Sequence, residues 1–165
     1  MKTGILFDLD GTLLNTLEDL VDATNYALAA FGHPPRTLKE VRRFIGNGAE
    51  NLIRLSLPDD HKEDLQQVLA VYKPYYTDHC QIKTKPYDGV LPALKTLGEK
   101  YPVAIVSNKP DAAVKALCAD YSRACMHWEK QPAVPGNLLP IWCIKPWKSS
   151  VLTAVSMWAT AKWMC

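Results

Sequence analysis

The stretch GILFDLDGT, residues 4–12, decides the fold. Its apolar run ends at Phe7 and is followed by Asp8, Asp10 and a glycine. This pattern is typical of a buried strand that ends in a polar turn. The sequence therefore predicts a strand over residues 4–7 with two carboxylates at its carboxyl end.

A second stretch, far along the chain, repeats this arrangement. Residues 103–106 are apolar, and Ser107, Asn108 and Lys109 follow them directly. In a parallel α/β sheet, ligand sites form where the strands end at their carboxyl edge. The segment between the two strands is far longer than a simple crossover requires, so we predict a helical insert over about residues 15–81 that covers this edge as a lid.

The insert contains several helical patterns. Thr16 opens a segment, residues 16–19, that resembles a capping box, and apolar residues then recur at helical spacing until Gly32. The other predicted helices cover about residues 37–45, 49–56 and 60–79, with one more after residue 89 that ends at Gly98.

The paired aspartates suggest phosphoryl chemistry. Asp8 and Asp10 cannot easily both stay ionised without a cation, and Mg²⁺ suits such carboxylates. One carboxylate can then attack phosphorus while the other transfers the proton of the leaving group. Backbone N–H groups of the turn, with Ser107 and Lys109, can hold the phosphoryl oxygens. The alternative is a capped strand end with solvated acids, which an isolated Asp-x-Asp pattern favours.

Two motifs decide between these readings. FDLDGTL, residues 7–13, resembles the first motif of the haloacid dehalogenase-like hydrolases, and residues 107–109 resemble the second. The resemblance extends through GNG at 46–48 and PYDGV at 86–90, and it covers about residues 1–121. Within the family, the chain is most similar to the phosphoglycolate phosphatase branch.

The resemblance implies an α/β fold: a Rossmann-like parallel-sheet core, here truncated, with an inserted helical cap domain. The hydrolase core would comprise residues 1–14 and 82–121, and the cap would comprise residues 15–81. Residues 122–165 fall outside it as an anomalous tail.

The resemblance also implies roles for individual residues. Asp8 would become phosphorylated and Asp10 would act as acid and base, with Mg²⁺ held by the Asp8 carboxylate and the Asp10 backbone carbonyl. The other site residues would orient the loop (Thr12), bind phosphate (Ser107), contribute a backbone group (Asn108) or line the pocket (Lys109). The implied function is Mg²⁺-dependent hydrolysis of small phosphomonoesters such as 2-phosphoglycolate, through an aspartyl-phosphate, in the cytoplasm.

The tail differs in composition from the rest of the chain. All five tryptophans lie after residue 122, and residues 122–165 carry five basic residues and one acid. The tail also lacks the family's lysine motif and its Gly-Asp-x-x-x-Asp motif, although Lys145-Pro146 imitates the first. Back-translation of residues 157–165 and a shift of one base permit Tyr-Val-Gly-Asp-Ser-Glu-Val-Asp-Val, and the same shift on residues 136–142 permits Arg-Lys-Pro-Ala-Pro-Asp-Met. We therefore interpret residues 122–165 as an out-of-frame translation, and expect a poorly packed end and an impaired enzyme.

Composition limits the other functional classes. The net charge of +2 provides no basic surface for nucleic acid, and no apolar run reaches the roughly 18 residues that a membrane span needs. The five cysteines are odd in number and irregularly spaced, so reduced cytosolic thiols are expected. Two sets of residues could be considered for zinc. No common ligand spacing is present in the first, Cys118, Cys125, His127 and Cys143, or in the second, His33, His61 and His79.

Three other functions stay open. A sugar-phosphate mutase of the same superfamily would need cap residues that hold a bisphosphate. A phospho-accepting signalling receiver also carries an aspartate at a strand end, but the long insert argues against it. A non-catalytic fragment is compatible with the same ancestry. The expected partner is a small phosphorylated metabolite.

Overall fold

A computed structural model describes residues 2–101, 103–124, 129–131, 141–143 and 152–157. The chain forms two compact units. The core unit comprises Met1–Asn15, Pro86–Ser107 and Leu117–Cys165, and the cap unit comprises Thr16–Lys85 and Asn108–Ala116. The sequence analysis assigned residues 108–116 to the core, whereas their contacts group them with the cap unit.

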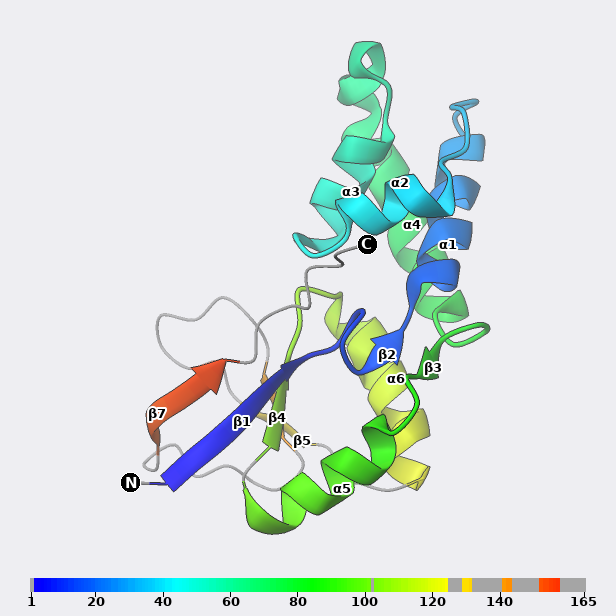
Figure 1. The fold of residues 1–165 in the computed structure, drawn as a ribbon. Helices are drawn as coiled ribbons and strands as arrows, with labels where there is room; N and C mark the ends of the chain where they lie inside the picture. Colours follow the sequence, from blue (N-terminus) through cyan, green and yellow to red (C-terminus); the bar gives the residue numbers. More distant parts are fainter. Residues whose placement is uncertain (1, 102, 125–128, 132–140, 144–151, 158–165) are drawn as a thin grey trace. The chain divides into compact units, whose positions relative to one another are not determined.

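A five-stranded sheet in the order β5-β6-β4-β1-β7 forms the centre of the core unit (Figure 1). The neighbouring strands β4, β1 and β7 run parallel, with β7 at the edge of the sheet, and residues 5–8 of β1 pair with residues 103–106 of β4. This confirms the predicted α/β class with a parallel-sheet core. The strands are β1 (Lys2–Asp8), β4 (Val103–Val106), β5 (Glu129–Gln131), β6 (Ile141–Cys143) and β7 (Leu152–Met157).

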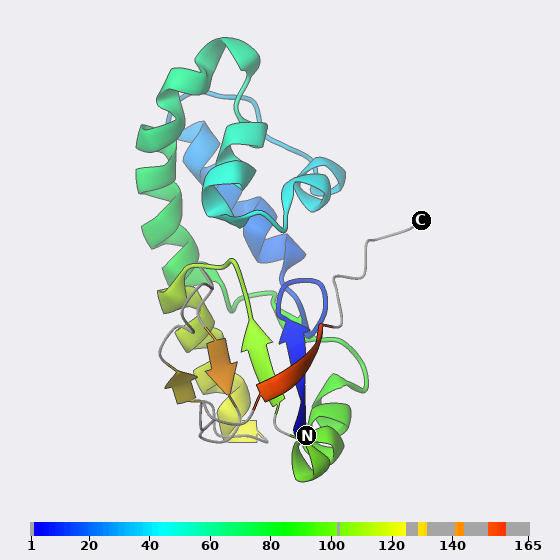
Figure 2. The ribbon, with the colours of Figure 1, turned by 90° about the vertical axis from the view of Figure 1, so that its left-hand side faces the viewer.

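Three strands of this sheet come from the tail. β7 lies beside β1, and β6 lies on the other side of β4 (Figure 2). β6 is antiparallel to β4 and to β5, so an antiparallel edge extends the parallel core of the sheet. An antiparallel pair needs no crossover helix, so this edge can form from a short segment. The packing of the tail's side chains lies outside the described residues.

Two helices follow the insert, α5 (Val90–Lys100) and α6 (Asp111–Ala124). Gly89 precedes α5 with φ 79°, a left-handed conformation that favours glycine. The prediction that this helix ends at Gly98 is wrong, because the helix continues to Lys100. Glycine inside a helix lowers the stability of the helix by only about 1 kcal/mol relative to alanine, and packing of the amphipathic face can offset this loss. Two short strands, β2 (Leu14–Asn15) and β3 (Lys85–Pro86), form a second sheet.

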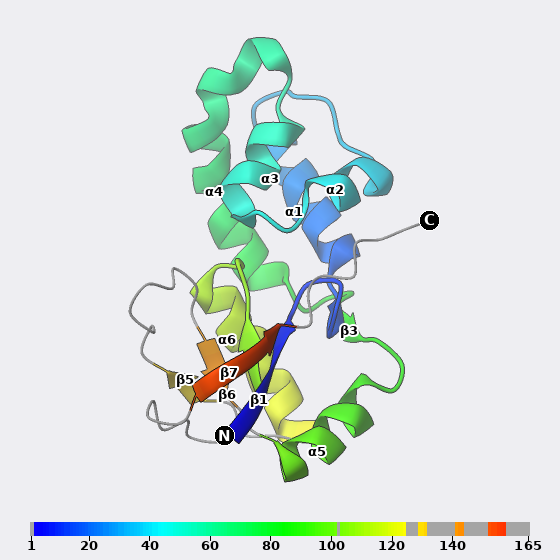
Figure 3. The ribbon, with the colours of Figure 1, turned by 60° about the vertical axis from the view of Figure 1, so that its left-hand side comes forward.

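The cap unit is a helical bundle in which α1 packs against α4, and α3 against α4 (Figure 3). Its elements are α1 (Leu17–Ala29), α2 (Leu38–Phe44), α3 (Gly48–Ser56), the 3₁₀ helix η1 (Asp59–Asp64) and α4 (Leu65–His79). Fully buried side chains of α1 and α4 form its interior, among them Ala27, Leu28, Val68, Tyr72 and Tyr76. The helical segments predicted from periodicity are present here. None of the helices in the described ranges is long and apolar enough to cross a membrane.

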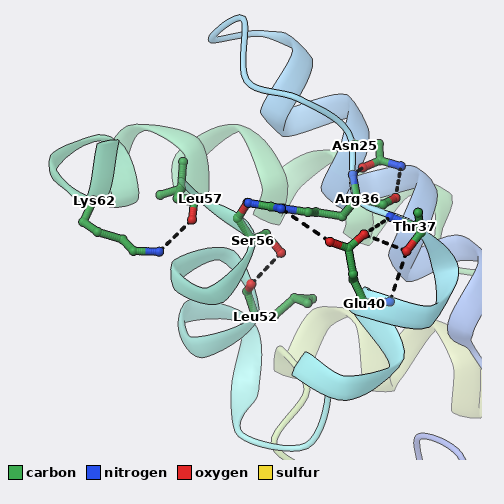
Figure 4. A network of polar contacts seen from close by, with 8 residues as sticks. All are labelled: Asn25, Arg36, Thr37, Glu40, Leu52, Ser56, Leu57 and Lys62. Carbon is green, nitrogen blue, oxygen red and sulfur yellow. Dashed lines mark hydrogen bonds and ion pairs between the residues drawn. The ribbon is translucent and has the colours of Figure 1, made fainter. Parts of the chain in front are cut away.

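Polar contacts connect the helices of the cap unit (Figure 4). The side chain of Asn25 on α1 accepts from the amide of Arg36 at 2.7 Å and donates to its carbonyl at 3.0 Å. The Arg36 guanidinium donates to the carbonyl of Ser56, at the end of α3, at 2.7 Å. Residue 36 therefore holds the loop between α1 and α2 against both α1 and α3.

The predicted capping box at Thr16 is wrong in detail. α1 does begin after Thr16, but the Thr16 side chain makes no capping hydrogen bond. The capping box lies at α2 instead, where Thr37 accepts from the amide of Glu40 and Glu40 accepts from the amide of Thr37. The third helical residue of α1 is Asp19, and its carboxylate accepts bonds from residues 83 and 84.

Candidate active site

Asp8 and Ser107 lie at the same edge of the core sheet. Asp8 is the last residue of β1 and is paired with Val106, the last residue of β4. Ser107 directly follows Val106, and it is buried with 2% of its surface exposed. The parallel register thus brings a carboxylate and a hydroxyl group to adjacent strand ends, which is the arrangement that the sequence predicted for this edge.

The turn after β1 is organised around Leu9. The amides of Leu13 and Leu14 donate to the Leu9 carbonyl at 3.1 and 3.0 Å, and Gly11 donates to the Leu14 carbonyl at 2.8 Å. Gly11 has φ 76°, so glycine relieves the strain that another residue would have there. The Leu9 side chain is 2% exposed, whereas Asp8 and Asp10 are both half-buried. The buried side chain of Leu9 thus lies between two half-buried aspartates in the sequence.

One expectation about this turn needs correction. The sequence analysis assigned its backbone N–H groups to phosphoryl oxygens, but the amides of Gly11, Leu13 and Leu14 donate within the turn itself. The Leu9 amide donates to Asp8 Oδ1 at 2.8 Å and orients that carboxylate. The amides of Gly11, Leu13 and Leu14 are therefore occupied within the turn, and side chains such as Ser107 remain candidates for holding a phosphoryl group.

The donor chemistry of the turn fits Mg²⁺. Asp8 and Asp10 offer carboxylate oxygens, the ligands that Mg²⁺ prefers, and both are accessible to solvent. Asp10 and Leu14 form an isolated β-bridge. Its hydrogen bonds run from the Gly11 amide to the Leu14 carbonyl and from the Leu14 amide to the Leu9 carbonyl. The Asp10 carbonyl, which the resemblance implies as a ligand, takes no part in that bridge. Thr12 is half-buried in the same turn.

Asn108 and Lys109 belong to the cap unit, and their contacts are described there. The Asn108 side chain donates to the carbonyl of Gly46 at 2.8 Å. Lys109 is buried, with its ammonium 4.7 Å from the centre of the Tyr76 ring. Gly46 and Gly48 have φ 115° and 81°, which explains the two glycines of the 46–48 segment. The sequence analysis noted these glycines but did not predict their contact with residue 108.

The family comparison identifies the fold of this site. The family described as haloacid dehalogenase-like hydrolase matches residues 5–119. The chain belongs to this family. The matched region ends just before the compositional change at residue 122.

Two relatives are similar to this chain over a stretch about as long as the hydrolase region. Phosphoglycolate phosphatase 1 of Pseudomonas aeruginosa is 38% identical over 120 residues, which cover 68% of this chain and 44% of the relative. The phosphoglycolate phosphatase of Thiobacillus denitrificans is 33% identical over 116 residues, 66% of this chain and 50% of the relative. The chain thus spans about half the length of these curated relatives.

A solved structure supports the same conclusion. A crystal structure of a predicted phosphoglycolate phosphatase from Haemophilus somnus is 29% identical and has a TM-score of 0.65. The similarity covers 72% of this chain and 57% of that chain. The hydrolase fold of the family is therefore shared with a solved relative at both the sequence and the structural level.

Proposed function

We propose that the hydrolase region of this chain is a Mg²⁺-dependent phosphomonoesterase that acts on a small substrate such as 2-phosphoglycolate through an aspartyl-phosphate. The observation that carries the proposal is the register of β1 and β4, with Asp8 and Ser107 at adjacent strand ends. The names of the relatives, phosphoglycolate phosphatases, support the substrate class.

The proposed chemistry has two steps. An oxygen of the Asp8 carboxylate attacks phosphorus, and the bond from phosphorus to the leaving oxygen breaks while Asp10 donates a proton to that oxygen. Asp10, now ionised, then takes a proton from water, whose oxygen attacks phosphorus and releases Asp8 and inorganic phosphate. The net reaction adds one water and leaves both aspartates as they began.

Other side chains hold the phosphoryl group during these steps. Ser107 donates its hydroxyl hydrogen to a phosphoryl oxygen, and Thr12 orients the turn. The family resemblance adds a backbone group of Asn108 and the positive charge of Lys109 as further phosphate-binding groups. The chemistry that bound Mg²⁺ supplies is neutralisation of the negative charge shared by Asp8 and the phosphoryl group. Asp8 and Asp10 are the residues that hold the ion.

We further propose that the tail, residues 122–165, is translated from the gene out of frame. The family match over residues 5–119 supports this reading, as do the two motifs that one base shift permits in order. Without the lysine and the second acidic cluster, the phosphoryl charge is only partly neutralised, so the chain as written has low turnover. Sequencing of the gene around the codon of Tyr121 tests the reading, because an intact frame through that codon contradicts it.

Hydrolysis of p-nitrophenyl phosphate with Mg²⁺ tests the activity. We expect Asp8→Asn to lower turnover at least about a thousandfold in a chain with the restored frame, since the nucleophile is lost. Asp78→Asn, an exposed aspartate of α4, is the control and should leave turnover unchanged. Labelled phosphate that remains on the acid-denatured chain and is released by base identifies the aspartyl-phosphate. Turnover in Asp8→Asn equal to that of the unchanged chain would contradict the proposal.

A further inference from the structure

Three side chains of the cap unit form a cluster that the sequence did not predict. His33 Nε2 lies 3.1 Å from Asp64 Oδ2, and His61 Nδ1 lies 3.7 Å from the same oxygen. One ligand atom from each of the three residues lies within 4.8 Å of the others. The two histidines are far apart in sequence, which is why their spacing alone gave no signal.

His33 is held in place from both sides. Its amide donates to the Leu28 carbonyl at 3.0 Å, and the amide of Gly32 donates to Ala29 at 3.1 Å, which together form a Schellman motif at the end of α1. Gly32 has φ 71°, as this motif requires. Two prolines follow His33 in the chain, and Arg36 is then clamped by Asn25 (Figure 4). The His33 ring is therefore preorganised, and its side chain is only 6% exposed.

The segment that carries the other two residues is anchored independently. The Lys62 ammonium donates to the carbonyls of Arg54 and Leu57 at 2.7 and 2.6 Å and so fastens η1 to the end of α3. Asp64 precedes α4, but its side chain makes no capping bond to that helix. The carboxylate turns to His33 instead. η1 has the sequence DDHKED, so four acids surround one lysine and one histidine, and the local charge favours a cation.

We propose that His33, His61 and Asp64 bind a zinc-class divalent metal ion in the cap unit. Two imidazoles and one carboxylate are a ligand set that Zn²⁺ accepts, with water in the remaining position, whereas Mg²⁺ prefers oxygen ligands alone. Zn²⁺ binding requires His33 Nε2 without a proton, so a proton on this atom would move to Nδ1 in a neutral ring or pass to the solvent from a protonated ring. The site is separate in residues and in chemistry from the aspartate pair of the core unit.

The two distances to Asp64 fit this ligand set, and the nitrogens of the two histidines lie within 4.8 Å of each other. Ligand atoms of a tetrahedral zinc ion lie about 3.3 Å apart, as bonds of roughly 2.0–2.1 Å require. The two contacts to Asp64 Oδ2, at 3.1 and 3.7 Å, are already close to this separation. Any remaining closure falls to His61, whose side chain is 48% exposed and can rotate toward the more rigid His33.

The imidazole ¹⁵N signals of the full chain, recorded while ZnCl₂ is added in the presence of Mg²⁺, test the proposal directly. We expect the signals of His33 and His61 to move together and to saturate at one equivalent, while those of His79 stay in place. His79 lies in the same unit with Nδ1 2.7 Å from the Tyr75 carbonyl, so it is a matched internal control. Zn²⁺ bound by cysteines would move neither imidazole. Saturating Zn²⁺ that leaves both His33 and His61 unmoved would overturn the proposal.

Variants make the assignment quantitative. His61→Gln removes a half-exposed ligand and should weaken Zn²⁺ binding at least about tenfold in a titration followed by calorimetry, with the helical circular dichroism unchanged. His79→Gln should bind as the unchanged chain does. His33→Gln should also lose binding, and because this residue is buried, His61→Gln keeps the test decisive if His33→Gln does not fold. Equal affinity in His61→Gln and His79→Gln would refute the site.

Discussion

The turn after β1 and the loop between α1 and α2 hold polar groups in place by different means. In the turn, backbone amides donate to the Leu9 carbonyl, the Leu9 amide donates to Asp8, and the Leu9 side chain is buried. In the loop, Arg36 donates to residues on two separate helices. Its amide donates to the Asn25 side chain on α1, and its guanidinium donates to the Ser56 carbonyl on α3. The turn is thus held by bonds between neighbours in the sequence, whereas the loop is held by bonds between residues that are far apart in the sequence.

This difference predicts where a substitution has the largest effect. Leu9→Ala removes the buried side chain on which the turn depends and should lower the free energy of unfolding by about 3–4 kcal/mol. Urea denaturation followed by circular dichroism measures the loss. Leu38→Ala, at an exposed leucine of the cap unit, is the control and should cost less than about 0.5 kcal/mol. Equal costs for the two leucines would mean that the turn does not depend on this burial.

The cap unit has its own anchor at Asp19, and its loss should cost less. The carboxylate is buried and accepts from the amides of Lys83, at 2.9 Å, and of Thr84, at 2.9 Å. It thereby ties the first turn of α1 to the segment before β3. Asp19→Ala leaves these amides without that partner and should cost about 2 kcal/mol, with faster hydrogen exchange at residues 83 and 84.

Asp22 provides a matched control for this anchor. It lies three residues further along α1 and contacts the side chain of the same Lys83, with its carboxylate 2.7 Å from the ammonium. Both groups of this pair are half-exposed, and such surface pairs contribute at most about 1 kcal/mol. Asp22→Ala should therefore leave hydrogen exchange at residues 83 and 84 unchanged. Faster exchange in Asp22→Ala than in Asp19→Ala would show that the ammonium pair, not the buried carboxylate, holds the segment.

The same contrast explains what the sequence could reveal. Residues 4–7 and 103–106 were recognisable as strands because each is a continuous apolar run, although residues 5–7 are half-buried and only residues 103–105 are buried. Their shared edge follows from the parallel register. The position of Asp8 beside the end of β4 needed no tertiary information beyond that. The helices of the insert were recognisable for a similar reason, since their apolar faces repeat at helical spacing.

The polar contacts of the cap were not recognisable in this way. A capping box was expected at Thr16, but the buried carboxylate of Asp19 has stronger partners at residues 83 and 84 than the helix end. Glu40, in contrast, forms the box with Thr37 although its other carboxylate oxygen also accepts from Arg36 at 3.5 Å. The meeting of His33 with His61 was invisible for the same reason, because it depends on how η1 folds back onto the end of α1. Local patterns predict elements, and tertiary contacts decide which polar groups pair.

The smallest expected effect concerns the capping box and depends on pH. The Thr37 hydroxyl, followed by the Thr37 amide, donates to Glu40, and these bonds hold the pKa of the Glu40 carboxyl below its ordinary value of 4.5. A pKa that is lower in the folded chain stabilises the fold above about pH 4.5, and this contribution is lost as the pH falls through the lowered pKa. Thr37→Ala should therefore raise the pKa of Glu40 toward its ordinary value, as a carboxyl ¹³C titration measures. Thr37→Ser retains the hydroxyl group and should keep the pKa low. If the pKa in Thr37→Ala stays as low as in Thr37→Ser, a group other than this hydroxyl lowers it, and the box contributes less to the cap than its geometry indicates.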